Sequence, residues 1–168
     1  MAVAVLVSSI LAWMGLEGFA STSEPHEHLP RELATGVALL AVHAAAIAEH
    51  LARDLTTPPA LFVTGGTLIV LGVSLRVTAI RALGSAFVST TTAPTRIIRS
   101  GPYRFMRHPS EVGLLAAAVG AAVLLSSGLA AGVIAFALAP LIIVRCAAED
   151  RTIVTARASR RAAITWAR

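Results

Sequence analysis

The feature that most constrains the fold of this chain is a long apolar run, from Val112 to Val144, that contains no charged residue. A membrane-spanning helix needs about 20 residues, so the run is too long for one span and short for two. Ser126, Ser127 and Gly128 stand at its middle and form a turn signal. The run therefore predicts a tight helical hairpin, and its many alanine and glycine residues favour close helix packing.

The composition also indicates a membrane protein. Hydrophobic residues make up 56% of the 168 residues and charged residues only 14%, whereas a soluble domain carries about 25% charged residues. The net charge of +5 would favour a nucleic-acid partner in a soluble protein. Here the arginines lie outside the apolar runs, so they indicate orientation in a membrane instead. We therefore expect membrane lipid, and no nucleic acid, as a partner.

The chain as a whole predicts an all-α polytopic membrane protein with a single domain over residues 1–168. About five transmembrane helices are expected, at 2–16, 33–51, 60–80, 112–126 and 129–146. No basic residue precedes the first of these segments, which favours a membrane helix over a cleaved signal peptide, the alternative there. Pro140 is expected to kink the second arm of the hairpin.

Charge in the connecting segments predicts the orientation. The segment 81–111 and the tail from Arg145 are both rich in arginine, so both ends of the hairpin should face the cytoplasm. We expect the cell membrane of a bacterium or an archaeon, with the active site on its cytoplasmic side. Towards the end of the sequence, arginines stand among apolar residues. Residues 156–168 are therefore expected to form a basic tail on the anionic membrane surface.

The segment Arg107-His108-Pro109 precedes the uncharged run. Pro109 suits the first turn of a helix, because its missing N–H would be unpaired there. The following N–H groups and the helix dipole favour an anion, and Arg104 and Arg107 add positive charge. The pattern indicates a carboxylate or phosphate site at the membrane edge. The alternative is that the arginines only contact lipid head groups.

The acidic pair Glu149-Asp150 follows the second arm of the hairpin. These carboxylates could accept hydrogen bonds from ribose hydroxyls or an ammonium group. The alternative is a solvated helix end, with Arg145 and Glu149 paired on one helix face. A short hairpin brings this pair to the same membrane face as Arg107. That arrangement suits a polar cofactor on the cytoplasmic side of these residues and a lipophilic substrate on their membrane side.

These residues resemble a known family. The pattern Gly-Pro-Tyr-Arg-x-x-Arg-His-Pro-x-x-x-Gly at 101–113, the uncharged hairpin and Arg-x-x-x-acid-acid at 145–150 are similar to the isoprenylcysteine carboxyl methyltransferase family and its phospholipid methyltransferase relatives. The resemblance covers residues 70–155, while 1–60 contribute generic membrane helices. It implies a membrane methyltransferase that uses S-adenosylmethionine as cofactor and acts on a lipophilic small molecule or a prenylated acceptor, most specifically by carboxyl O-methylation of an isoprenylcysteine-type group.

The resemblance also implies the residue roles. It places the cofactor at the Arg-His-Pro segment and the acidic pair, so the expected cofactor-binding residues are Arg107, His108, Pro109, Glu111, Gly113, Glu149 and Asp150. From the chemistry of an anionic acceptor, we expect Arg145, Glu149 and Arg104 as the catalytic residues. The sequence departs from the family pattern at Glu111, where the family often has tyrosine, at Asp150, where glutamate is usual, and in a tail that lacks the usual tyrosine-containing stretch. An amine or thiol acceptor would need a base, for which His108 or Glu111 is the candidate.

Two other functions remain open. An NADPH-dependent, sterol-reductase-like membrane enzyme has a similar loop and topology, although the acidic pair favours S-adenosylmethionine. A non-catalytic membrane subunit is the other alternative.

No metal is expected, because His26 and His28 lack a third ligand nearby and Cys146 is the single cysteine. His43 and His50 should make a helix–helix hydrogen bond or mark a helix end at the membrane interface. Arg76 should either extend to the membrane interface or face the cofactor.

Overall fold

The computed structural model describes residues 29–54, 56–83 and 100–166, with side chains described between 33 and 151 and at 154 and 155. In these ranges the chain is helical and has no strand, which confirms the all-α prediction. Three helical stretches are long and apolar enough to cross a membrane, at Leu33–Ala52, Pro59–Leu83 and Gly128–Arg151. Pro109–Leu124 is a shorter apolar helix. The expected first span at 2–16 lies outside the described residues.

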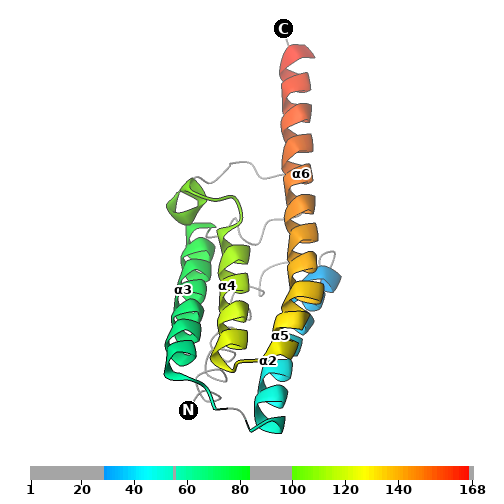
Figure 1. Cartoon of the computed structure of the whole chain (residues 1–168). Helices are drawn as coiled ribbons and strands as arrows, with labels where there is room; N and C mark the ends of the chain where they lie inside the picture. Colours follow the sequence, from blue (N-terminus) through cyan, green and yellow to red (C-terminus); the bar gives the residue numbers. More distant parts are fainter. Residues whose placement is uncertain (1–28, 55, 84–99, 167–168) are drawn as a thin grey trace.

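The helices run alternately up and down the bundle (Figure 1). Their order is α2 (Leu29–Ala52), α3 (Pro59–Leu83), the 3₁₀ turn η2 (Gly101–Arg104), α4 (Pro109–Leu124), α5 (Gly128–Val133), the π-helical turn η3 (Ile134–Leu138) and α6 (Ala139–Trp166). The predicted turn between the hairpin arms is present. Ser126 adopts a left-handed conformation with φ of 54°, and the Ser127 hydroxyl accepts a hydrogen bond from the amide of Ala130 at 3.0 Å, capping α5.

α3 and α4 approach each other closely, and their contact is far more extensive than that between the arms of the hairpin. Gly65 and Gly72 on α3 face Gly120 and Gly113 on α4. A Cβ atom on Gly72 would lie 2.6 Å from the carbonyl oxygen of Gly113, and one on Gly120 would lie 2.8 Å from the carbonyl oxygen of Gly65. Real Cβ atoms do not come so close, so the two backbones touch only because these positions carry no side chain.

The buried core joins α2 to the other helices. Val42 on α2, Leu114 and Leu124 on α4, Leu125 after it and Leu138 in η3 are almost fully buried. The outer faces of the helices instead expose large apolar residues, among them Val37, Val63, Val70, Leu71, Ile143 and Val144. Exposed apolar faces on every long helix are what a lipid environment requires, and the protein is an integral membrane protein.

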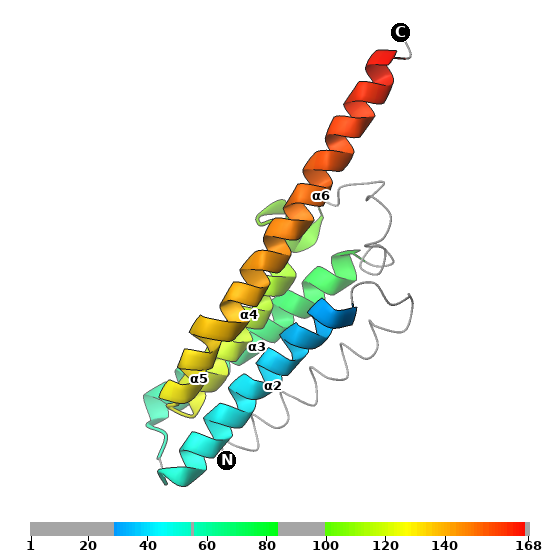
Figure 2. The same ribbon diagram turned by 90° about the vertical axis from the view of Figure 1, so that its right-hand side faces the viewer.

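The second arm of the hairpin is one continuous helix from α5 through η3 to α6 (Figure 2). A π turn lies just before Pro140, where the amide of Ala139 donates to the carbonyl of Ile134, five residues back. A proline removes one donor and crowds the preceding turn, and a wider turn relieves this. The kink expected at Pro140 stays a prediction. α6 then continues past the end of the bundle to Trp166. The placement of residues 156–168 on a membrane surface stays a prediction.

Candidate active site

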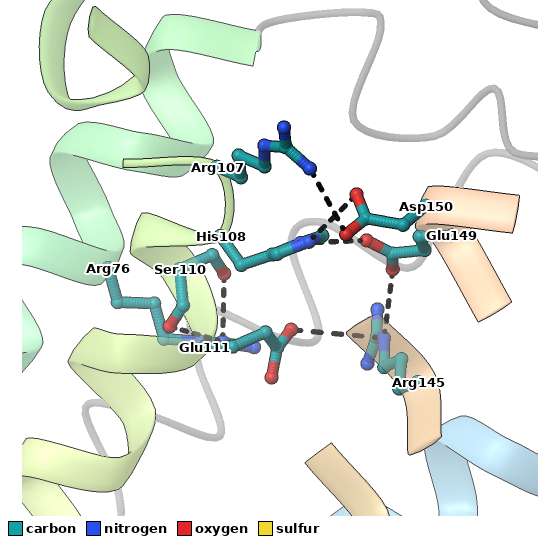
Figure 3. Close-up of polar contacts among 8 residues, drawn as sticks. All are labelled: Arg76, Arg107, His108, Ser110, Glu111, Arg145, Glu149 and Asp150. Atoms are coloured by element: carbon teal, nitrogen blue, oxygen red, sulfur yellow. Dashed lines mark hydrogen bonds and ion pairs between the residues drawn. The ribbon is translucent and has the colours of Figure 1, made fainter. Parts of the chain in front are cut away.

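Charged side chains from three helices and one loop gather where α4 begins, beside α6. This end of the bundle lies opposite the turn that joins α4 to α5 (Figure 1). Figure 3 shows the members of this charged cluster, which are Arg76, Arg107, His108, Ser110, Glu111, Arg145, Glu149 and Asp150. They come from α3, from the loop before α4, from the first turn of α4 and from α6. The two segments that the sequence singled out therefore do meet in space.

The outer layer of the charged cluster joins the loop to the acidic pair. His108 lies at the N-cap of α4 with Pro109 at the first helical position, as predicted. Its Nδ1 is 3.3 Å from Oε2 of Glu149 and its Nε2 is 3.4 Å from Oδ1 of Asp150. Nη1 of Arg107 lies 3.6 Å from Oδ2 of Asp150. The Arg107 side chain is 83% exposed, so most of this guanidinium stays accessible to a ligand.

The inner layer lies one helical turn further into the bundle. Nε of Arg145 is 3.8 Å from Oε1 of Glu111 and 3.3 Å from Oε1 of Glu149. Arg145 therefore pairs with Glu149 on its own helix, as the spacing allows, and also links α6 to α4. The Glu111 side chain is only 8% exposed, and its Oε2 has no hydrogen-bond partner among the described residues. In Figure 3 that oxygen points away from His108.

Arg76 fixes the start of α4 from the side of α3. Its Nη1 donates to the carbonyl oxygen of Ser110 at 3.2 Å and to the Ser110 hydroxyl at 3.0 Å. Arg76 is 5% exposed and Ser110 6%. The arginine therefore faces the charged cluster rather than the membrane interface. Sequence reasoning considered this placement, but it missed Ser110 as the partner, since nothing in the sequence pairs two residues on different helices.

The pKa of Tyr103 in η2 is raised by its burial and by the negative charge of the cluster. Burial, reinforced by the nearby carboxylates of Glu149 and Glu111, raises the pKa of Tyr103 to about 12, although Arg76 acts in the opposite direction. The phenol therefore keeps its proton at every physiological pH and can serve only as a neutral hydrogen-bonding group.

Two of the predicted site residues lie apart from the charged cluster. Arg104 is exposed on η2, and its guanidinium lies 5.9 Å from the centre of the Phe105 ring. Gly113 packs against α3, where a Cβ atom would meet the carbonyl oxygen of Gly72. Gly113 thus supports the site by letting α4 approach α3.

The opposite end of the bundle holds a second buried carboxylate, which sequence reasoning missed. Oε2 of Glu49 accepts hydrogen bonds from the Ser127 hydroxyl at 2.7 Å and from the Leu129 amide at 2.8 Å. Its Oε1 lies 3.1 Å from Arg53. Next to it, His50 Nδ1 lies 3.3 Å from the carbonyl of Leu125 at the end of α4, which agrees with the expected hydrogen bond between helices. This network ties α2 to the start of α5.

The remaining histidines add no site. His43 Nδ1 bonds the carbonyl of Leu39 in its own helix at 2.8 Å, and His26 and His28 lie outside the described residues. Among the described residues, no group of three potential metal ligands occurs.

The comparisons with known proteins bear on this arrangement. The family model of isoprenylcysteine carboxyl methyltransferases matches residues 65–155, which is more than half of the chain. The chain belongs to the isoprenylcysteine carboxyl methyltransferase family. Comparison with curated proteins and with solved structures gives no match. The family match begins at Gly65 and includes the glycine contacts of α3 with α4 and the whole charged cluster. Membership makes the protein a membrane methyltransferase.

Proposed function

We propose that the protein transfers a methyl group from S-adenosylmethionine to the carboxylate of a lipophilic, isoprenylcysteine-type acceptor, at the cytoplasmic face of the cell membrane. The observation that carries this proposal is the layered charged cluster over apolar helices. Its outer layer contains accessible groups of both signs, and its inner layer holds Arg145 beside the buried Glu111. On this proposal a polar ligand would bind the outer layer, and a lipophilic ligand would approach along the apolar helices.

The outer layer fits S-adenosylmethionine by the chemistry of its groups. The cofactor carries a carboxylate, an ammonium and ribose hydroxyls, and when bound it supplies a methyl group on a positively charged sulfur. Arg107, His108 and the N-terminus of α4 at Pro109 would hold the carboxylate. Glu149 and Asp150 are about two-fifths exposed and would accept hydrogen bonds from the hydroxyls or the ammonium. Gly113 would support this arrangement through packing.

The inner layer fits an anionic acceptor. A carboxylate is already ionised at neutral pH, so its methylation needs no base in the protein. It needs a fixed orientation and the exclusion of water. Arg145, which is 25% exposed, would orient the acceptor carboxylate. Arg104, which is exposed on η2, stays a second candidate for this role.

The test is methyl transfer by the purified full-length protein in detergent or lipid. S-adenosylmethionine labelled in its methyl group is incubated with S-prenyl-N-acetylcysteine, and the product is treated with base. A methyl ester releases labelled methanol, whereas a methylated amine or thioether keeps its label. Base-labile label is the expected result. Base-stable label on an amine or thiol acceptor, or no transfer to any lipophilic acid, would contradict carboxyl methylation.

A further inference from the structure

One carboxylate of the charged cluster is buried but only partly paired. The Glu111 side chain is 8% exposed, and its Oε1 lies 3.8 Å from Nε of Arg145. Its Oε2 has no hydrogen-bond partner within the part of the chain that the structure describes. By contrast, both oxygens of Glu49, an equally buried glutamate at the far end of the bundle, are engaged by neighbouring groups. A buried carboxylate oxygen without a partner is costly, so a ligand that brings a donor or a positive charge to it is favoured.

The negative charge of Glu111 is a departure of this chain from the family pattern, which often has tyrosine at this position. A tyrosine is neutral at physiological pH. With Glu111 present, the three arginines of the charged cluster face three carboxylates, leaving His108 aside. With a tyrosine in its place, the arginines would be in excess. Glu111 therefore removes an excess of positive charge from the cluster, which makes the site more favourable for a ligand with a net positive charge.

On the proposed function, Glu111 lies beside the atoms that react. Arg145 would orient the acceptor carboxylate, and methyl transfer requires the donor sulfur and the acceptor oxygen to be held close together. The positively charged sulfur would therefore lie near Arg145, which repels it. Arg76 adds to this repulsion, because it is close enough to interact with Glu111 through its charge (Figure 3). A carboxylate 3.8 Å from Arg145 offsets the repulsion.

We propose that Oε2 of Glu111 recognises the positive charge on the sulfur of S-adenosylmethionine. The protein then binds this form more tightly than S-adenosylhomocysteine, the neutral thioether that remains after methyl transfer. This inference rests on the proposed function, and it gives Glu111 a role in the exchange of product for fresh cofactor. Because transfer of the methyl group removes the charge from sulfur, the attraction to Glu111 is lost when the reaction is complete. Glu111 itself forms and breaks no covalent bond, so it is a specificity-determining residue.

The experiment measures binding rather than turnover. S-adenosylmethionine and S-adenosylhomocysteine are titrated separately into the full-length protein in detergent, without an acceptor, and the two dissociation constants are compared by calorimetry. The wild-type protein should bind S-adenosylmethionine more tightly by about 10-fold or more, the effect of one attractive charge at an enclosed site. In Glu111→Gln, which keeps the shape and removes the charge, the ratio of the two constants should fall to about one or below. In the matched control Glu49→Gln the ratio should stay as in the wild type.

A third ligand keeps the test decisive if Glu111→Gln does not fold. Sinefungin carries a charged amino group where S-adenosylmethionine carries its sulfonium, so the wild-type protein should also bind it more tightly than S-adenosylhomocysteine. Glu111→Asp keeps the charge and should retain the preference for both charged ligands. Equal affinity of the wild-type protein for charged and neutral ligands, or an unchanged preference in Glu111→Gln, would overturn the inference and leave methyl transfer standing. Failure of the proposed function would appear separately, as the absence of binding by all three ligands and of methyl transfer to any lipophilic acid.

Discussion

Arg76 on α3 donates from a single nitrogen to both the carbonyl oxygen and the hydroxyl of Ser110 on α4, at 3.2 and 3.0 Å. Ser110 is two residues from His108, so the contact fixes the helix start that orients the histidine towards Glu149 and Asp150. Arg76 thereby acts as a positioning residue for the outer layer of the charged cluster.

Replacement of Arg76 should therefore slow turnover more than it weakens acceptor binding. In Arg76→Lys the shorter side chain does not reach both Ser110 oxygens, and kcat should fall about 10- to 100-fold with little change in the acceptor KM. Ser110→Ala keeps the carbonyl acceptor and should lose less. Steady-state kinetics on both variants checks this, and a wild-type kcat in Arg76→Lys would show that the contact has no positioning role.

Glu149 is predicted to be essential for turnover but not for folding. It pairs with both His108 and Arg145, yet its side chain is 39% exposed, so its loss costs little packing. Glu149→Ala should reduce methyl transfer by about 100-fold or more while the thermal unfolding temperature changes little. Asp54→Asn neutralises an exposed acid at the far end of the bundle and serves as the control. Full activity in Glu149→Ala would remove Glu149 from the site.

The α3–α4 contact makes a prediction about stability. In Gly72→Ala the new Cβ would lie 2.6 Å from backbone atoms of α4, and backbone cannot move aside cheaply. The free energy of unfolding should fall by about 1–3 kcal/mol. Gly66→Ala, on the same helix with open space around it, should leave stability unchanged or slightly improved. Equal unfolding temperatures for the two variants would show that the helices do not touch there.

Tyr103 predicts a pH effect that absorbance can isolate, because it is the only tyrosine in the chain. Its pKa of about 12 is raised above the ordinary value near 10. The folded state thus binds the proton more tightly than the unfolded state. The contribution of Tyr103 to stability is complete below the unfolded pKa and is lost as the pH rises through the folded pKa.

The tyrosinate absorbance of the folded protein should therefore show a midpoint near pH 12. In the unfolded protein the midpoint of the tyrosine titration should lie near the ordinary value of about 10. Tyr103→Phe should abolish the signal. A folded-state midpoint near the ordinary value would mean that Tyr103 is neither buried nor close to the carboxylates of Glu149 and Glu111.

The helices and their order were predictable because they follow from local patterns. The uncharged run, the turn at Ser126 and Ser127 and the helix start at Pro109 each depend on residues that are neighbours in sequence. The meeting of His108 with Glu149 was also predictable, because a hairpin returns the chain to the same membrane face. The family assignment from the Arg-His-Pro segment and the acidic pair was confirmed.

The packing between distant segments was not predictable. The alanine and glycine residues of α4 predicted that another helix packs closely against it. The sequence did not indicate that this helix is α3 rather than the second arm of the hairpin. The Glu49–Ser127 and Arg76–Ser110 hydrogen bonds join residues far apart in sequence, and each member alone matches an ordinary helix or turn residue. The separate position of Arg104 depends on the conformation of η2, and the sequence Gly-Pro-Tyr-Arg does not indicate where that side chain points.

The most direct test of this account is calorimetric titration of the full-length protein with S-adenosylhomocysteine, the product form of the proposed cofactor, with NADPH titrated in parallel. We expect S-adenosylhomocysteine to bind, NADPH not to bind, and the double variant His108→Ala, Glu149→Ala to lose binding while remaining folded. Binding of NADPH instead would indicate a reductase. If a folded protein bound neither ligand, the charged cluster would not be a cofactor site, and the account of its function would be wrong.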